Sequence, residues 1–404
     1  MSEVTTEDAA GRRQEPVVLS PAQERSALSV AAEAAGARLI TSRTRSIHHR
    51  PGRSRSVLHD ATIEVAGQRH EVVLVTHVET RGFPDGAFVL SADELEVAVW
   101  RFPNDPYLPG LPSAASAKRV RELLDELGAA PGRVRLRTRA YRPVRRAVVE
   151  VRIDGERSGR VLYLKILPRP RARSVARRHR QLIAAGLPVP GVVGLAERQG
   201  IVAIEALGGP TLADALRVGA PVPRPEQLLA VTEGFTGSGV QGSGDPRRFA
   251  DPLRHVPLLA GILPERGTEI AGLAREAAAV EAPLVGVHGD LHAGQLLLGA
   301  DGAVSGVLDV DGAGQGYTVH DAGTLVAHLE AFGDLAPAIT DRVHAYAREV
   351  AEAYAEVCGR QALARAMAGS WIGLATGAYR AQEPGWQLEL ERRIDRAAAL
   401  LSTV

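Results

Sequence analysis

One stretch of the chain constrains its fold more than any other. Residues 285–316 read VGVHGDLHAGQLLLGADGAVSGVLDVDGAGQG, with polar side chains on both sides of an apolar pattern. Residues 296–298 and 304–308 predict two short strands joined by a glycine-containing turn. Such a hairpin brings Gln295 and Asp309 together at its open end. An amide oxygen beside a carboxylate suits Mg²⁺, which proteins hold through one or two carboxylates and substrate phosphates.

The loop that leads into this hairpin carries the candidate acid–base residues. Asp290 precedes the hairpin, where it could accept the proton of an attacking hydroxyl group. His288 is expected to hold the loop by hydrogen bonds. Asp311 is expected either to bind a second magnesium ion or to brace Asp309. Asp321 is expected to cap the next helix or to anchor the loop that follows the hairpin.

These residues together resemble the signature of the aminoglycoside phosphotransferase family. The motif HGDLHAGQ followed by LDVD carries the resemblance, which covers about residues 130–400. It implies a protein-kinase-like fold with Asp290 as the catalytic base. It also implies that Gln295 and Asp309 bind Mg²⁺, with Asp311 as a further candidate. His292 stands where protein kinases carry a lysine that reaches the transferred phosphate.

The glutamine of this motif refines the resemblance. Most members of the family carry asparagine at the position of Gln295. With a glutamine there, the sequence resembles the maltokinase and related sugar-kinase branch. The resemblance implies an ATP- and Mg²⁺-dependent kinase that phosphorylates a hydroxyl of a small molecule, with a sugar or aminosugar favoured as acceptor. An aminoglycoside-type antibiotic kinase and a nucleotide-binding pseudokinase without turnover are the alternatives.

A lysine upstream supports the same fold. The chain has two lysines, Lys118 and Lys165, among 48 basic residues. Lys165 lies in a predicted strand over residues 160–167, where a kinase-like lobe needs a lysine for the α- and β-phosphates. A surface lysine at a strand end is the alternative. Residues 201–207 resemble the family's hinge, whose backbone from Glu205 to Leu207 would meet the adenine edge.

The predicted helix over residues 172–185 departs from the family pattern. The family pairs the strand lysine with a glutamate on this helix, but the helix contains no glutamate. His179, Gln181 or a residue elsewhere in the chain is therefore expected to contact Lys165.

The loop between the first two strands of this lobe departs as well. Residues 141–146 (YRPVRR) hold no glycine, so this loop cannot wrap phosphates with backbone N–H groups. Arg142, Arg145 and Arg146 then either cover the phosphates with charge or are exposed turn residues.

The pattern along the chain predicts an α+β protein with two lobes and an extra domain. Residues 1–21 are expected to be a loose terminus, and 22–114 a β-rich domain similar to the cap of the maltokinase branch. Residues 115–207 are expected to form a sheet lobe of five mostly antiparallel strands with one inserted helix. Residues 208–404 then form a helical lobe with the catalytic loop. The arginine-rich segment 41–56 is expected to be a solvated loop, with phosphate binding as the alternative.

Composition excludes several other classes of protein. Forty-eight basic against 47 acidic residues leave a net charge of +1, which argues against a dedicated nucleic-acid binder. Cys358 is the single cysteine, so an intramolecular disulfide and thiolate-rich zinc sites are excluded. No apolar run approaches the roughly 18–20 residues that cross a bilayer, and no signal peptide is visible. We expect a cytoplasmic monomer or homodimer without membrane contact.

Two further alternatives depend on particular side chains. A metal-dependent hydrolase could use His288, Asp290 and His292, but it would leave the hairpin and Asp309 unexplained. Near the end of the chain, four residues suit sugar binding but also a buried helical core. They are Trp371, Tyr379, Glu383 and Trp386.

Overall fold

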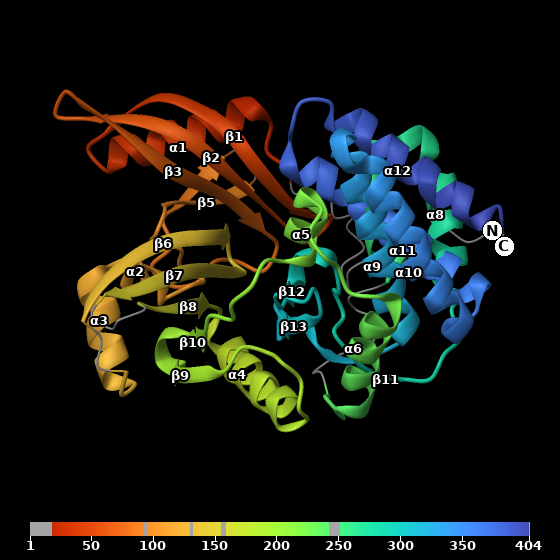
Figure 1. The fold of residues 1–404 in the computed structure, drawn as a ribbon. Coiled ribbons are helices and arrows are strands. Elements are labelled where there is room, and N and C mark those ends of the chain that lie inside the picture. The colour runs from red at the N-terminus through yellow and green to blue at the C-terminus, as the bar shows by residue number, and fades with distance from the viewer. Residues whose placement is uncertain (1–17, 93–94, 130–131, 155–158, 242–250, 404) are drawn as a thin grey trace.

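The protein has three parts, a cap, a sheet lobe and a helical lobe (Figure 1). The cap and the sheet lobe lie together on one side, and the helical lobe lies on the other. The predicted α+β class and the two-lobe arrangement with a β-rich N-terminal part are confirmed. Most of the predicted loose terminus lies outside the described residues. The computed structural model describes residues 18–92, 95–129, 132–154, 159–241 and 251–403.

The cap is a five-stranded antiparallel sheet with one helix on it. The strand order is β1-β2-β3-β5-β4. The helix α1 was not expected from the sequence, although Ser20 and Gln23 form a capping box at its start. Leu28 of α1 is fully buried in a core with the apolar face of the sheet. The elements are α1 (Pro21–Ala34), β1 (Arg38–Arg50), β2 (Ser54–Val65), β3 (Gln68–Glu79), β4 (Val89–Ala92) and β5 (Leu95–Arg101).

The expectation of a solvated loop over residues 41–56 was wrong. This segment forms most of β1 and the start of β2, which pair antiparallel. Exposed and half-buried residues alternate along β1, and Arg43 and Arg45 both form ion pairs with Asp60 of β2. Arg43 and Arg45 therefore occupy the solvent side of a strand, where a cross-strand carboxylate balances their charge.

The sheet lobe contains the five strands that the sequence predicted. They are all antiparallel, in the order β6-β7-β8-β10-β9, and α4 is inserted between β8 and β9. The elements are α2 (Leu111–Ala114), α3 (Ala117–Glu126), β6 (Arg133–Arg142), β7 (Arg146–Asp154), β8 (Arg160–Ile166), α4 (Arg169–Ala184), β9 (Val192–Ala196) and β10 (Ile201–Glu205).

The alternation of side chains along β8 decides where Lys165 points. Leu162 and Leu164 are fully buried in the core that α3 covers. Tyr163 packs instead into the core beneath α4. Because successive side chains of a strand point to opposite faces, Lys165 shares the α4 face with Tyr163.

The helical lobe surrounds two small two-stranded sheets, β11–β14 and β12–β13. In the described part of the chain, no helix has the length and apolarity needed to span a membrane. The helices are α5 (Leu212–Val218), α6 (Pro225–Gly237), α7 (Val256–Ile262), α8 (Gly267–Ala277), α9 (Thr318–Asp334), α10 (Thr340–Cys358), α11 (Arg360–Ala381) and α12 (Trp386–Leu401). The strands are β11 (Val285–Val287), β12 (Leu296–Leu298), β13 (Val304–Val307) and β14 (Gly314–Gly316).

The cap contacts both lobes. Strand β1 packs against α11 of the helical lobe. On the other side, the Trp100 indole donates a hydrogen bond to the Tyr141 hydroxyl at 2.8 Å. The cap thus bridges the two lobes near the β6–β7 turn.

Candidate active site

The predicted hairpin places Gln295 beside Asp309. Leu296 lies opposite Val307, and the Leu308 N–H donates to the Gln295 carbonyl at 2.8 Å. The Gln295 side chain is buried, and its Oε1 has no hydrogen-bond partner among the described residues. A buried amide oxygen without a partner costs about 1–3 kcal/mol, so this atom fits a position that a bound cation would occupy.

Asp309 is held by an arginine from the sheet lobe. Its backbone adopts a left-handed conformation with φ 54°, which is strained for a residue with a side chain and is common at functional sites. Arg146 Nη1 and Nη2 lie 3.0 and 3.1 Å from Asp309 Oδ1 and Oδ2. Arg146 is therefore not an exposed turn residue, and it joins the β6–β7 turn to the helical lobe.

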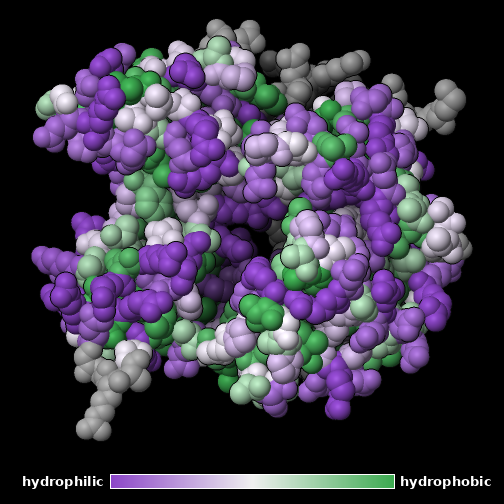
Figure 2. All heavy atoms as spheres, turned by 45° about the horizontal axis from the view of Figure 1, so that its top comes forward, coloured by the Kyte–Doolittle hydropathy of each residue, from purple (hydrophilic) through white to green (hydrophobic). Residues whose placement is uncertain are grey.

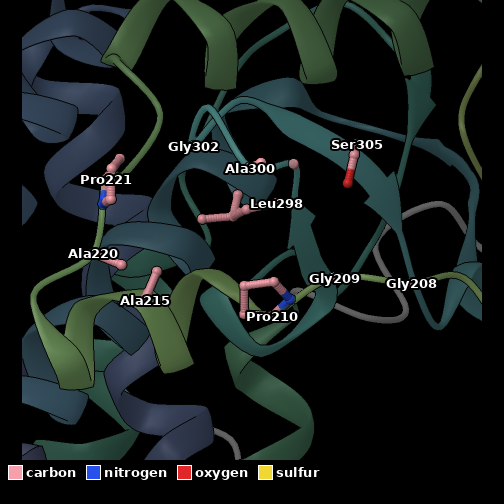
Figure 3. Close-up of a pocket in the computed structure, with 11 residues that line it drawn as sticks. Gly208, Gly209, Pro210, Ala215, Ala220, Pro221, Leu298, Ala300, Gly302 and Ser305 are labelled. Atoms are coloured by element: carbon pink, nitrogen blue, oxygen red, sulfur yellow. The ribbon is translucent and has the colours of Figure 1, made fainter.

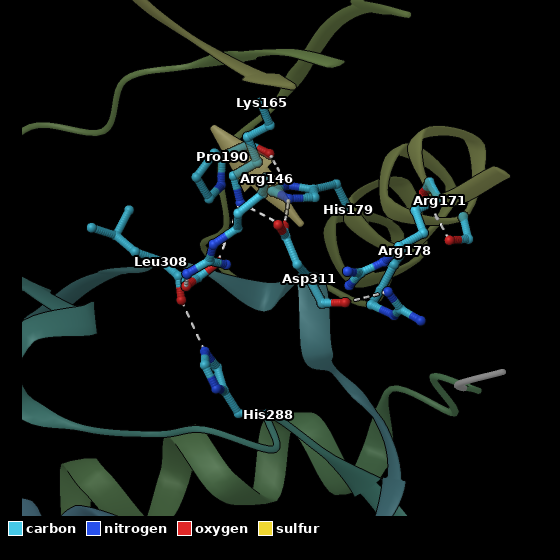
Figure 4. A network of polar contacts seen from close by, with 11 residues as sticks. Arg146, Lys165, Arg171, Arg178, His179, Pro190, His288, Leu308 and Asp311 are labelled. Atoms are coloured by element: carbon cyan, nitrogen blue, oxygen red, sulfur yellow. Dashed lines mark hydrogen bonds and ion pairs between the residues drawn. The ribbon is translucent and has the colours of Figure 1, made fainter. Parts of the chain in front are cut away.

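Lys165 finds its partner in the helical lobe (Figure 4). Its Nζ lies 2.5 Å from Asp311 Oδ1 and 3.6 Å from Asp309 Oδ1. His179 of α4 also faces Asp311, with Nε2 3.4 Å from Oδ1, and it donates from Nδ1 to the Pro190 carbonyl at 2.9 Å. Asp311 thus takes the place of the absent helix glutamate.

Asp311 is buried, and its surroundings determine its ionisation. Only 7% of its side chain is exposed. Burial alone would raise the pKa of its carboxyl group, but the charge of Lys165 and the hydrogen bond with His179 hold that pKa well below the usual range. In this structure Asp311 is an ion-pair partner of Lys165, and its role as a magnesium ligand stays a prediction.

A network of hydrogen bonds fixes the catalytic loop. The backbone N–H groups of His288 and Gly289 donate to the two carboxylate oxygens of Asp321 at 2.7 and 2.8 Å. His288 Nε2 donates to the Leu308 carbonyl at 2.9 Å. Asp321 therefore anchors the loop before the hairpin, and not the loop after it as expected. The buried His288 ties this loop to the far strand of the hairpin.

Asp290 and His292 lie on this fixed loop. The Asp290 side chain reaches the surface of the cleft, but burial by the surrounding protein raises the pKa of its carboxyl group. Burial lowers the pKa of His292, which favours the neutral ring. His292 Nδ1 accepts the Gly294 N–H at 3.1 Å, so a neutral ring carries its proton on Nε2. Its ring stacks on His328 with centroids 4.9 Å apart, a contact that no sequence pattern indicated.

The hinge residues lie beside the hairpin. The N–H groups of Glu205 and Ala206 already donate to backbone carbonyls. The Leu207 N–H has no partner among the described residues, so it is the hinge donor that remains open. A Cβ atom on Gly306 would lie 2.9 Å from Leu207, which shows how closely the hinge approaches strand β13.

A buried aspartate fixes the β6–β7 turn, and no sequence pattern indicated it. Asp105 Oδ2 accepts hydrogen bonds from the Tyr141 hydroxyl and from the Val144 N–H, both at 2.9 Å. Val144 has φ 57°, a strained conformation for a β-branched residue. Asp105 therefore holds the turn that carries Arg146 without any glycine.

A cavity of about 490 Å³ lies between α5, the linker after β10 and the β12–β13 hairpin (Figure 3). Its walls are mostly apolar. None of the candidate catalytic, metal or nucleotide residues lines it. The lining residues are Gly208, Gly209, Pro210, Ala215, Ala220, Pro221, Leu298, Gly299, Ala300, Gly302 and Ser305.

The aromatic residues near the end of the chain belong to the helical core. Trp371 is buried, and its indole N–H donates to Glu330 at 3.2 Å. Tyr379 and Trp386 contact each other edge to face, with centroids 5.3 Å apart. Within the described residues, no three histidine, cysteine or carboxylate side chains converge as a metal-binding group.

Comparison with known proteins identifies a family. Residues 146–359, more than half of the chain, match the family described as "Phosphotransferase enzyme family". No curated protein sequence matches the chain.

Three kinases are among the solved structures with a similar fold. A choline/ethanolamine kinase family protein from Mesorhizobium loti has 16% identity and a TM-score of 0.46 over 70% of this chain and 94% of that one. Amicoumacin kinase hAmiN, in complex with AMP-PNP, Ca²⁺ and Ami, has 14% identity and a TM-score of 0.48 over 70% and 96%. A thermostable mutant of an aminoglycoside phosphotransferase, with ADP and hygromycin B, has 14% identity and a TM-score of 0.45 over 70% and 97%.

Proposed function

The chain belongs to the phosphotransferase enzyme family and is a small-molecule kinase, and on that premise we propose that it transfers the γ-phosphate of Mg²⁺–ATP to a hydroxyl of a sugar or aminosugar. One observation carries the proposal. A candidate base, Asp290, lies on the loop that leads into the hairpin and within electrostatic range of the Asp309 carboxylate, and the hairpin begins at Gln295, whose buried Oε1 has no partner among the described residues. Base and metal ligands thus share one end of the hairpin.

The residues at this end suit a divalent cation. Gln295 offers a buried oxygen without a partner, and Asp309 offers a carboxylate beside it. In the proposed complex these two residues hold Mg²⁺, and Arg146 gives up its contact with Asp309. The bound cation would neutralise charge on the phosphate oxygens.

Lys165 is placed to bind the α- and β-phosphates. Its ammonium group has three N–H donors, and its Nζ is within ion-pair distance of Asp311 and Asp309. Asp311 orients the ammonium group in its buried position. The open Leu207 N–H meets the adenine edge at the other end of the cleft.

Asp290 orients the acceptor hydroxyl and takes its proton during transfer. Its raised pKa makes the carboxylate a stronger base than an exposed aspartate, which favours proton abstraction. His292 donates from Nε2 to the transferred phosphoryl group as a neutral ring, and the stack on His328 fixes the orientation of that ring.

ADP release tests the proposed function. The protein is incubated with Mg²⁺–ATP and maltose, glucose, glucosamine, an aminoglycoside or buffer alone, and Asp290→Asn serves as the blank. We expect ADP release that depends on an acceptor and is absent from the blank. Stabilisation by nucleotide without ADP release would favour the pseudokinase, and absence of nucleotide binding would contradict the proposal.

A further inference from the structure

Four arginines from four separate elements gather at the mouth of the cleft. We call them the arginine cluster: Arg50 at the end of β1, Arg142 at the end of β6, Arg254 in the 3₁₀ turn Pro252–His255, and Arg380 in α11. Strand β1 and the 3₁₀ turn both pack against α11, which brings these elements together. Burial and the charges of Arg380 and Arg146 lower the pKa of Arg142 to about 10, and the charges of Arg50 and Arg254 add to the shift.

Two members of this cluster, Arg142 and Arg380, form no ion pair with a described carboxylate. The Nε atom of Arg142 is also buried without a hydrogen-bond partner. Like charges at short range repel, and a buried donor without a partner costs free energy. An anion between the guanidinium groups would remove both costs.

Two histidines beside the cluster are neutral. Burial and the charges of Arg142 and Arg380 hold the pKa of His48 at about 3. Burial and the charges of Arg254 and Arg380 do the same for His255, whose Nε2 accepts from Arg254 Nε at 3.2 Å. These histidines add hydrogen-bonding groups and no charge. Figure 2 shows a hollow with hydrophilic walls at the centre of the molecule, between the parts that carry these elements.

The cluster lies on the acceptor side of the reacting group. Burial lowers the pKa of Arg380, and the charge of Asp290 opposes that shift, so the two side chains are within electrostatic range of each other. Three of the four arginines come from the cap and the helical lobe. Lys165 and the hinge, which would hold the nucleotide, belong to the sheet lobe. The cluster is therefore placed for the molecule that receives the phosphate.

We infer that the acceptor carries an anionic group, a phosphate or a carboxylate, which the arginine cluster binds while the acceptor hydroxyl faces Asp290. This inference rests on the proposed function and narrows its substrate class. The planar guanidinium group matches the paired oxygens of both anions. A polycationic aminoglycoside would be repelled at this site. The cap has a defined part in it, because β1 supplies Arg50 and His48.

A titration with inorganic phosphate tests this inference. The full chain is first saturated with Mg²⁺–AMP-PNP, and phosphate is then added in a calorimeter, with acetate in a parallel run. We expect the wild type to bind phosphate or acetate, and Arg380→Gln and Arg142→Gln each to weaken that binding at least tenfold. The tighter of the two probes identifies the anionic group.

Arg360→Gln is the matched control. Arg360 is exposed on the same helix, roughly 30 Å along its axis from Arg380 at 1.5 Å per residue. This variant should bind both probes like the wild type, and melting curves show that all variants fold. Equal binding by all variants, or no binding by the wild type, would overturn the inference.

Two further outcomes separate the inference from the proposed function. If phosphate binds only in the absence of AMP-PNP, the arginines bind the nucleotide phosphates and not the acceptor. That result overturns the inference but leaves the proposed function intact. Failure of AMP-PNP to bind in the first step would contradict the proposed function. The probes are then titrated into the free protein, where dependence on Arg380 still decides whether the cluster is an anion site.

Discussion

Arg146 contacts both carboxylate oxygens of Asp309, at 3.0 and 3.1 Å, across the cleft between the two lobes. The arginine ends a turn without glycine, and the aspartate ends the catalytic hairpin. Because the guanidinium group covers the oxygens that a cation would need, Arg146 and a metal ion compete for Asp309.

This competition predicts the effect of removing the arginine. Arg146→Gln should bind Mn²⁺ several-fold more tightly than the wild type in the absence of nucleotide, because the carboxylate loses the cationic partner that contacts both of its oxygens. Electron paramagnetic resonance of free Mn²⁺ measures the affinity. Arg392→Gln, an exposed position on α12, should behave like the wild type. Unchanged or weaker binding by Arg146→Gln would remove Asp309 from the metal site.

The buried Lys165–Asp311 pair predicts a pH-dependent loss of stability. Lys165→Met should lower the free energy of unfolding by about 3–5 kcal/mol at neutral pH, because it leaves Asp311 buried without its main partner. In the wild type the Asp311 pKa is held low, so its stabilising contribution is lost only when the pH falls through that low value.

In Lys165→Met the direction reverses. Without Lys165, burial raises the pKa of Asp311, and the buried carboxylate lowers the free energy of unfolding as long as it is ionised. Protonation removes that charge, so the free energy of unfolding rises again as the pH falls through the raised pKa. In urea unfolding, the difference in the free energy of unfolding between Lys165→Met and the wild type should therefore become smaller from neutral to mildly acidic pH. Lys118→Met, at the other lysine and exposed on α3, should change little. A penalty that does not vary with pH would contradict the pairing.

Asp105 predicts a link between the cap and the turn that carries Arg146. Asp105→Ala removes the acceptor for the Tyr141 hydroxyl and the Val144 N–H, which should cost about 3 kcal/mol. Turnover should fall as well, since the strained turn loses its support. Chemical unfolding and ADP release measure the two effects, with Asp125→Ala on the exposed side of α3 as control. Equal stability of both variants would contradict this role.

The raised pKa of Asp290 predicts an acid limit to activity. Asp290 must be ionised to accept a proton, so kcat/KM should fall as the pH drops through its pKa. Since burial raises that pKa, the midpoint should lie above the ordinary aspartate value of about 3.9. Circular dichroism over the same range shows that the protein stays folded. Activity that is constant below that value would exclude Asp290 as the base.

The sequence predicted those parts of the fold that short-range patterns determine. The hairpin that brings Gln295 and Asp309 together follows from two apolar runs and one turn. The five strands of the sheet lobe follow in the same way. The segment 41–56 was predicted to be a loop because it is rich in arginine. It forms a strand instead, and Arg43 and Arg45 form ion pairs with Asp60 of β2.

Contacts between distant parts of the chain could not be predicted from the sequence. Asp311 is 146 positions from Lys165, and Arg146 is 163 positions from Asp309. Neither pair leaves a local pattern, because the packing of the two lobes determines both. The confirmed assignment is the phosphotransferase family, while the maltokinase-like branch remains a prediction.

Phosphoryl transfer by Asp290→Asn tests the central claim most directly. ADP release with the best acceptor of the panel is measured alongside Mg²⁺–AMP-PNP affinity, with Asp341→Asn on the exposed start of α10 as control. The account predicts unchanged nucleotide affinity and a turnover about 10²–10⁴-fold below the wild type for Asp290→Asn. Turnover near the wild-type rate in that variant would contradict it.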